Sequence, residues 1–141
     1  WVYLITELSN KIHCYKIDEG PILIETHQSS TIHESQKSES FSADITIDPL
    51  GLFLYASNRG LDCISIFSIS QIDGTLNYLK TESAEGESPW SLDINSTGDF
   101  LIVANQHSNN IVIFQRNKEN GMISKIAKLQ DVSNTVAAKF C

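Results

Sequence analysis

The sequence predicts an all-β protein that forms part of a β-propeller, in which four-stranded antiparallel sheets, called blades, surround an axis. Three observations lead to this prediction. One pattern recurs from Trp1, Phe53 and Phe100, which are 52 and 47 residues apart. Apolar residues alternate with a period of two, as in strands, rather than about 3.6, as in helices. Turn signals such as Asp-Gly and Asn-Gly separate the apolar segments.

Three segments align without gaps and define the two central strands of each unit. They read WVYLITELSNKIHCYKI, FLYASNRGLDCISIFSI and FLIVANQHSNNIVIFQR. Each is a short strand, a polar turn and an alternating strand. A preceding strand is predicted from ADITIDPLG and WSLDINSTG, and a following strand from EGPILIETH, DGTLNYLKT and NGMISKIAK. The complete unit therefore has four strands, which is typical of a propeller blade.

The repeat positions set the expected boundaries of one partial propeller domain over residues 1–141. We expect an incomplete blade, two complete blades and a lone inner strand, at residues 1–40, 41–84, 85–130 and 131–141. A propeller closes with about 4 to 8 blades. We therefore expect this chain to be the C-terminal part of a larger propeller, whose missing N-terminal blades are its partners.

Two segments allow an alternative interpretation. The polar stretch 28–40 (QSSTIHESQKSES) is expected to be a surface loop that joins the first two units. Residues 124–138 have a spacing that an amphipathic helix could also show. Their place in the repeat predicts strand, turn and strand instead.

The composition bears on the class of function. The net charge is −7 and the basic residues are scattered, which argues against nucleic acid or an anionic membrane as a partner. No apolar run in the sequence reaches the length of about 18 residues that a membrane helix needs, and the sequence shows no signal-peptide pattern. The three cysteines form no CxxC pair, and we expect a reducing, cytoplasmic location. The four histidines lack metal-ligand spacing, so we expect neither metal nor cofactor.

One column of the repeat contains polar side chains of different kinds. Glu7, Arg59 and Gln106 each close the second strand of a unit, just before the turn. Equivalent positions on successive blades form an arc around the axis, so these groups are expected at one end of the channel. The alternative is that Glu7 and Arg59 form only an ion pair between blades. Their neighbours Asn58 and Asn105 are expected to be turn residues.

Several motifs resemble those of a known family. They are TELSN, LYASNRG..CISIFSI, DGTL, G.SPW..DI...GDFLIVANQ and NNIVIF. In content, order and spacing they resemble the seven-bladed propeller lactonases, which include the propeller-type 6-phosphogluconolactonases and the fungal 3-carboxy-cis,cis-muconate lactonising enzymes. The resemblance covers essentially the whole chain and corresponds to the last three blades of that family. It implies about three blades of a seven-bladed propeller, a small anionic lactone as substrate and no cofactor.

The resemblance also assigns expected roles to single residues. The family's cleft glutamate and arginine match Glu7 and Arg59, and the glutamine of its Asn-Gln motif matches Gln106. Asp44 matches a position that is usually acidic. The family often has Pro-Arg where this chain has Pro-Trp, so Trp90 replaces a second arginine of the cleft.

These residues suit the hydrolysis of an activated lactone. Glu7 is expected to act as the general base, while Arg59 holds an anionic group or faces the oxyanion. Gln106 is expected to orient substrate hydroxyls, and His107 follows it in the turn. Trp90 is expected either to pack at the channel mouth or to stack on a sugar-like ring.

We therefore expect hydrolysis of a sugar-acid lactone such as 6-phosphogluconolactone. The alternatives are a carboxymuconate cyclase, which uses similar groups in a lactonising reaction, and a non-catalytic propeller that binds a partner protein. A cleft at the Glu7–Arg59–Gln106 column would favour an enzyme, whereas a pair of Glu7 and Arg59 sealed from solvent would favour a scaffold.

Overall fold

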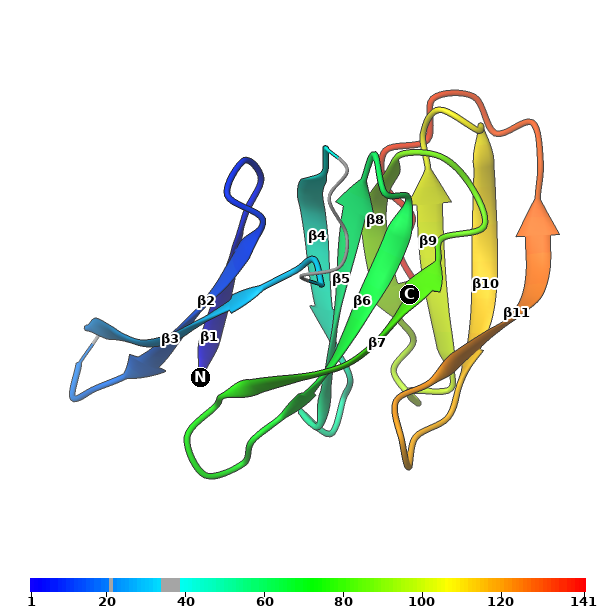
Figure 1. Ribbon diagram of the computed structural model, residues 1–141. Coiled ribbons are helices and arrows are strands. Elements are labelled where there is room, and N and C mark those ends of the chain that lie inside the picture. The colour runs from blue at the N-terminus through cyan, green and yellow to red at the C-terminus, as the bar shows by residue number, and fades with distance from the viewer. Residues whose placement is uncertain (21, 34–38) are drawn as a thin grey trace.

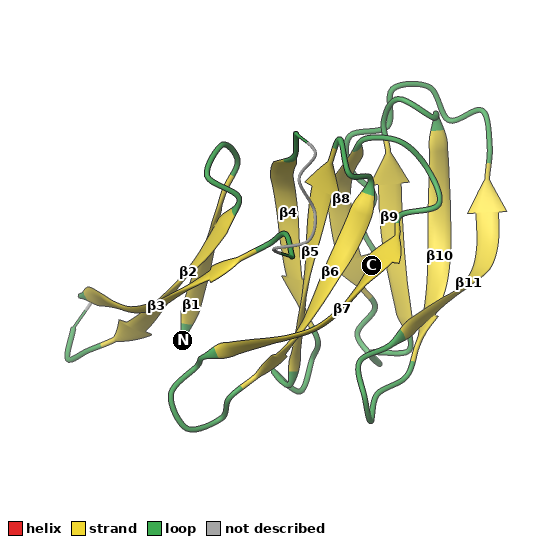
Figure 2. Ribbon diagram, in the orientation of Figure 1, coloured by secondary structure: helices red, strands yellow, loops and turns green. Residues whose placement is uncertain are grey.

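The computed structural model describes residues 1–20, 22–33 and 39–141 (Figure 1). Within these ranges every regular element is a strand (Figure 2), and no helix could span a membrane. The all-β prediction is therefore confirmed. The strands are β1 (Val2–Thr6), β2 (Lys11–Ile17), β3 (Leu23–Ser30), β4 (Phe41–Ile47), β5 (Phe53–Arg59), β6 (Cys63–Ile69), β7 (Leu76–Ser83), β8 (Pro89–Ile94), β9 (Phe100–Asn105), β10 (Asn110–Arg116) and β11 (Ile123–Leu129).

The strands form three antiparallel sheets in chain order. Their orders are β1-β2-β3, β4-β5-β6-β7 and β8-β9-β10-β11. The register repeats as the sequence alignment predicts, because aligned residues occupy equivalent ladder positions, namely Val2↔Tyr15, Leu54↔Phe67 and Leu101↔Phe114. We propose that the three sheets are the blades whose boundaries the repeat predicted.

The middle sheet has the most deeply buried central strands. In β5 and β6 nearly every side chain is buried, so both faces of these strands are covered. One apolar cluster joins the middle sheet to the third, around Tyr55, Ile64 and Val103. A second cluster joins it to the first sheet, around Ile12 and Leu54. A strand covered on both faces has no need of polar alternation, which explains the nearly continuous apolar run CISIFSI.

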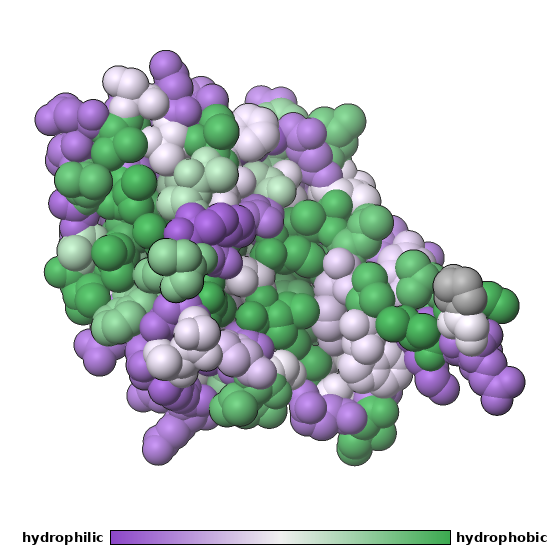
Figure 3. All heavy atoms as spheres, turned by 180° about the vertical axis from the view of Figure 1, so that it is seen from behind, coloured by the Kyte–Doolittle hydropathy of each residue, from purple (hydrophilic) through white to green (hydrophobic). Residues whose placement is uncertain are grey.

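The first sheet is more open. Leu4, Leu23 and Ile24 each remain about half exposed. In the space-filling view this sheet projects as the smaller lobe, and hydrophobic and hydrophilic side chains are mixed over the visible face (Figure 3). The middle sheet, which has apolar clusters toward both other sheets, is therefore buried more deeply than the first sheet, which has one.

A tyrosine–glycine contact recurs between successive sheets. The hydroxyl of Tyr3 donates to the Gly74 carbonyl, and that of Tyr55 donates to the Gly121 carbonyl, both at 2.7 Å. Both glycines have a φ of 75°, in the left-handed region that favours glycine. A Cβ atom at Gly121 would lie 2.4 Å from Cδ1 of Phe53. Glycine therefore allows the hairpin turn of one sheet to approach the preceding sheet closely.

A buried ion pair also joins the second and third sheets. Arg116 Nη2 lies 3.3 Å from Asp48 Oδ2, and both side chains are at most 2% exposed. Arg116 Nε donates to the Tyr55 hydroxyl at 2.7 Å, and Nη1 donates to the Gly98 carbonyl at 2.5 Å. Asp48 Oδ1 accepts the amide of Phe53 at 2.7 Å. The charges are thus embedded in a network that crosses between the sheets.

The lone inner strand expected within residues 131–141 is absent, because this segment forms no strand. Strand pairing needs a neighbour, and an inner strand pairs with the next strand of its own blade, which this sequence does not supply. The segment lies beside β8, where Lys139 Nζ donates to the Leu92 carbonyl and the Phe140 amide donates to Asp93 Oδ2, both at 2.7 Å.

The two ambiguous segments are also resolved where the structure describes them. The expected loop over residues 28–40 is partly wrong, because residues 28–30 extend β3 by pairing with β2. Residues 34–38 of that stretch lie outside the described residues. The segment 124–138 forms no helix, and it contributes most of β11 followed by an irregular tail.

Candidate functional site

Three equivalent turns bring the candidate residues to one end of the molecule. The β1–β2, β5–β6 and β9–β10 turns lie together at the upper end in Figure 1. Each contains a residue with φ near 50° in the same column of the repeat, namely Asn10, Asp62 and Asn109. The carbonyl of each accepts the amide of the chain entering the next unit, from Thr31, Ala84 and Val132 respectively. The turns therefore fasten successive units at this end, and the tail enters in the same way.

Glu7 and Arg59 meet across the boundary between the first two sheets. Glu7 follows β1, Arg59 ends β5, and Arg59 Nη2 donates to Glu7 Oε1. The Arg59 side chain is 15% exposed, whereas that of Glu7 is 57% exposed. The inter-sheet ion pair therefore forms, but it is not sealed from solvent. Because the Glu7 carboxylate remains open to solvent, Glu7 and Arg59 can bridge the two sheets and still face a ligand.

Trp90 packs against Arg59. The Arg59 guanidinium carbon lies 3.9 Å from the centre of the Trp90 ring, close enough for a cation–π interaction. The Phe41 ring is more distant, at 5.9 Å. Arg59 Nε and Trp90 Nε1 are both buried without a hydrogen-bond partner in the described residues. The guanidinium of Arg59 is thus held between two contacts, the Trp90 indole on its face and the Glu7 carboxylate at its edge.

A hollow of about 360 Å³ opens beside this arginine, and we call it the Arg59 hollow. Two of the predicted site residues, Arg59 and His107, lie in its wall. Gln106 lies nearby, since its amide donates to the Ser88 carbonyl at 2.9 Å, but its side chain is not part of the wall. The complete lining is Phe41, Arg59, Gly60, Asp62, Glu87, Ser88 and His107.

Asp44 has a different environment. Its Oδ2 accepts the amide of Leu92 at 2.9 Å, and its Oδ1 accepts the amide of Ile45 at 2.9 Å. Lys139 Nζ lies 3.9 Å from Oδ2. The carboxylate therefore ties β4 to β8 and lies outside the wall of the Arg59 hollow.

Sequence reasoning did not identify Asp62, Glu87 and Ser88 as site residues. Asp62 is in the same turn column as Asn10 and Asn109, so its position could have been found from the repeat. Glu87 and Ser88 belong to the connection between β7 and β8, where the units differ in length and no column can be aligned. Only folding brings this connection against Arg59.

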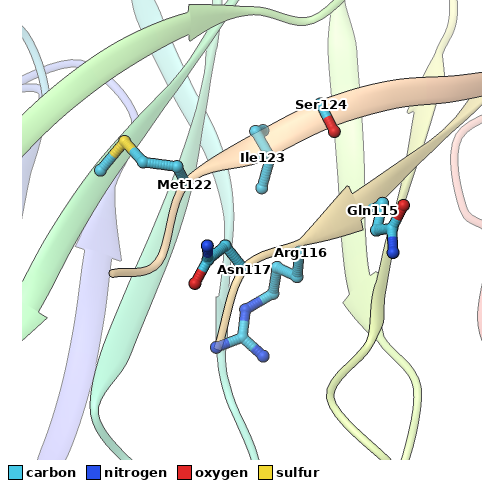
Figure 4. Close-up of a pocket in the computed structure, with 6 residues that line it drawn as sticks. All are labelled: Gln115, Arg116, Asn117, Met122, Ile123 and Ser124. Carbon is cyan, nitrogen blue, oxygen red and sulfur yellow. The ribbon is translucent and has the colours of Figure 1, made fainter. Parts of the chain in front are cut away.

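A second hollow, of about 340 Å³, lies at the β10–β11 hairpin (Figure 4). Arg116 is the one charged residue in its lining, which comprises Gln115, Arg116, Asn117, Met122, Ile123 and Ser124. Because Arg116 is committed to Asp48, Tyr55 and Gly98, this hollow offers no free acid or base. The described residues also contain no cluster of three or more His, Cys, Asp or Glu that could hold a metal.

Comparison with known proteins gives a consistent result. The family described as "Lactonase, 7-bladed beta-propeller" matches residues 1–140. A 6-phosphogluconolactonase of Formosa agariphila is 45% identical over 127 residues, which are 88% of this chain and 35% of the relative. A 6-phosphogluconolactonase of Bacillus subtilis is 30% identical over 99% of this chain and 40% of the relative.

Two solved structures resemble the fold of this chain. A putative 6-phosphogluconolactonase from Bacteroides uniformis matches with a TM-score of 0.86 and 31% identity, over 96% of this chain and 38% of that structure. A protein from Lactobacillus plantarum matches with a TM-score of 0.88 and 29% identity, over 94% and 39% of the two chains. The chain thus spans well under half the length of these proteins.

Proposed function

The chain belongs to the lactonase family of seven-bladed β-propellers, and on this premise we propose that the full-length gene product hydrolyses the lactone of a sugar acid, such as 6-phosphogluconolactone. The observation that carries the proposal is the solvent-open pair of Glu7 and Arg59 beside a hollow of about 360 Å³. The name of the Formosa agariphila and Bacillus subtilis relatives, 6-phosphogluconolactonase, supports the class of substrate.

In this proposal Glu7 is the general base. Its carboxylate takes a proton from water as the water oxygen attacks the lactone carbonyl, a contribution of roughly 10²- to 10⁴-fold. The bond from the carbonyl carbon to the ring oxygen then breaks, and the ring oxygen receives a proton. The 57% exposure of Glu7 supports this role, because water can reach the carboxylate.

Arg59 is proposed to serve both the base and the substrate. One nitrogen, Nη2, holds Glu7, while the Trp90 ring covers the guanidinium. The remaining N–H groups can stabilise the oxyanion or donate a single hydrogen bond to an oxygen of the substrate. Gln106 and His107 are proposed to contact substrate hydroxyls. Trp90 contributes by supporting the guanidinium.

Asp44 is proposed to support the site from the inner strands rather than to bind substrate by itself, because both its oxygens already accept backbone amides. Beyond the site, we propose a cytoplasmic role in carbohydrate metabolism, in the pentose phosphate pathway. We also propose that further blades of the same gene product complete the propeller, in agreement with three sheets here and seven blades in the family.

Steady-state kinetics on phosphorylated gluconolactone, corrected for spontaneous hydrolysis, test the proposal with two variants of the full-length product. Glu7→Gln keeps the shape but removes the base, so it should lower kcat by roughly 10²-fold or more. Arg59→Lys keeps the charge but loses the planar fork, so it should mainly raise KM. Glu119→Gln, on the distant β10–β11 turn, is the matched control and should behave as wild type.

Full activity in both variants, with only a loss of thermal stability, would show that the pair is merely a bridge between blades. The same variants assayed with 3-carboxy-cis,cis-muconate test the lactonising alternative.

A further inference from the structure

The positive charge of the Arg59 hollow is already compensated. The Arg59 guanidinium contacts the Glu7 carboxylate at its edge and the Trp90 ring at 3.9 Å on its face. Its Nε is buried, which leaves little of the planar fork free. Bidentate recognition of phosphate needs two parallel N–H donors on one free edge. The arginine is therefore poorly disposed to hold a phosphate group in this hollow.

Two carboxylates in the wall have no such compensation. Asp62 Oδ1 accepts the amides of Ser88 at 2.8 Å and Gly60 at 3.2 Å, and no cation contacts it in the described part of the chain. Glu87 is exposed, and its backbone is engaged by Ser108 Oγ and the His107 amide. No hydrogen bond or ion pair involves the Glu87 carboxylate among residues 1–20, 22–33 and 39–141. The hollow is accordingly negative.

The remaining wall suits an uncharged ring that carries hydroxyl groups. Phe41 offers an apolar face, and Gly60 contributes only backbone to the wall. Carboxylates accept hydrogen bonds from hydroxyl donors readily, whereas they repel a phosphate that carries about −1.5 to −2 charges at pH 7. An apolar face combined with two acceptors is thus complementary to a polyhydroxylated ring.

We infer that the Arg59 hollow receives the uncharged, hydroxyl-bearing part of the lactone and excludes phosphate, and that Glu87 determines this selectivity. The inference rests on the proposed function, because it assigns the part of the substrate that occupies the same site. A phosphorylated substrate would have to direct its phosphate away from this hollow.

Charge reversal at Glu87 gives a measurable effect. Glu87→Lys changes the local charge by two units, and we take a separation of about 8 Å between residue 87 and a phosphate in the hollow for a Coulomb estimate. Coulomb's law in water predicts about tenfold tighter phosphate binding at about 0.01 M ionic strength, and about threefold at about 0.15 M. Because Glu87 is exposed, the substitution should leave folding intact. Glu119→Lys makes the same change of net charge on the distant β10–β11 turn and is the matched control.

The experiment uses the full-length product and follows the indole Nε1–H NMR signal of Trp90, assigned with Trp90→Phe. Glucose serves as the uncharged ring, and inorganic phosphate serves as the anion. In the wild type, glucose at millimolar concentration should shift the signal and phosphate should not. Glu87→Lys should acquire the salt-dependent response to phosphate, whereas Glu119→Lys should not.

The inference is overturned if phosphate shifts the wild-type signal more readily than glucose, if neither ligand shifts it, or if Glu87→Lys and Glu119→Lys respond alike. A parallel assay with gluconolactone and its 6-phosphate separates the two proposals. If the wild type hydrolyses neither, the proposed function fails, while the NMR titration still decides what the hollow binds.

Discussion

Replacement of Asp48 by Asn tests how the second and third sheets are held together. The substitution removes one charge from the buried pair with Arg116, which lies 3.3 Å away, while preserving the shape of the side chain. Asn can still accept the Phe53 amide through Oδ1. The third sheet already does this at the equivalent position, where Asn95 Oδ1 accepts the Phe100 amide at 2.9 Å. The change therefore removes the charge and replaces the acceptor that faces Arg116 Nη2 by an N–H donor, without altering the shape.

The expected cost follows from burial. Arg116 and Asp48 are 1% and 2% exposed, so Asp48→Asn leaves a guanidinium charge without compensation in the interior. Loss of one partner of such a pair costs about 3–5 kcal/mol. Arg116 keeps its bonds to the Tyr55 hydroxyl and the Gly98 carbonyl, so we expect the lower end, about 3 kcal/mol. The double variant Asp48→Asn, Arg116→Met removes both charges and should cost only about 1–2 kcal/mol.

Equilibrium urea unfolding of the full-length product measures these free energies. The exposed pair of Asp99 and Lys118 provides the control, and Asp99→Asn should leave the midpoint of unfolding nearly unchanged. A loss below about 1 kcal/mol for Asp48→Asn would refute the reasoning, as would a double variant no more stable than the single one. Either result would mean that water or relaxation compensates the charge.

Two further predictions concern the contacts between sheets. Burial is the main cause of the raised pKa of Tyr3 and of Tyr55. The contribution of these two tyrosines to the free energy of unfolding should therefore be complete below a pH of about 10 and fall above it, because the unfolded state loses their protons first. Tyr55→Phe should weaken this fall when unfolding is measured at alkaline pH. An unchanged dependence of the unfolding free energy on pH would contradict the linkage. Gly121→Ala should cost about 2–4 kcal/mol in urea unfolding, because its Cβ meets Phe53, whereas Gly51→Ala, with the same sign of φ and nothing within 4 Å, should cost about 1 kcal/mol. Equal costs would mean that the Phe53 contact relaxes freely.

The column of Glu7, Arg59 and Gln106 illustrates how far the candidate site could be predicted. Repetition placed these residues at equivalent ends of strands, and the structure has them at one end of the molecule. The Glu7–Arg59 contact was one of two stated alternatives. The stacking of Arg59 on Trp90 was not predicted, because alignment of columns does not give side-chain directions. Glu87 lies in a connection of variable length, so it had no column from which to be predicted.

The amino-acid sequence by itself determined the local features of this protein: strands with a period of two, polar turns between them, and the pairing register within each sheet. These depend on interactions between residues close in the chain, which a repeat makes visible. The expectation of turn residues at Asn58 and Asn105 was wrong, because both lie in strands, β5 and β9, and the left-handed residues are Asn10, Asp62 and Asn109.

Only the tertiary structure decided which charges are buried and which face a ligand. Arg116 shares its column with Ile17 and Ile69, and nothing local distinguishes a buried arginine from an exposed one. Its environment depends on Asp48, 68 residues earlier on another sheet, since Coulomb and desolvation energies are set by distance in space and by burial rather than by sequence spacing.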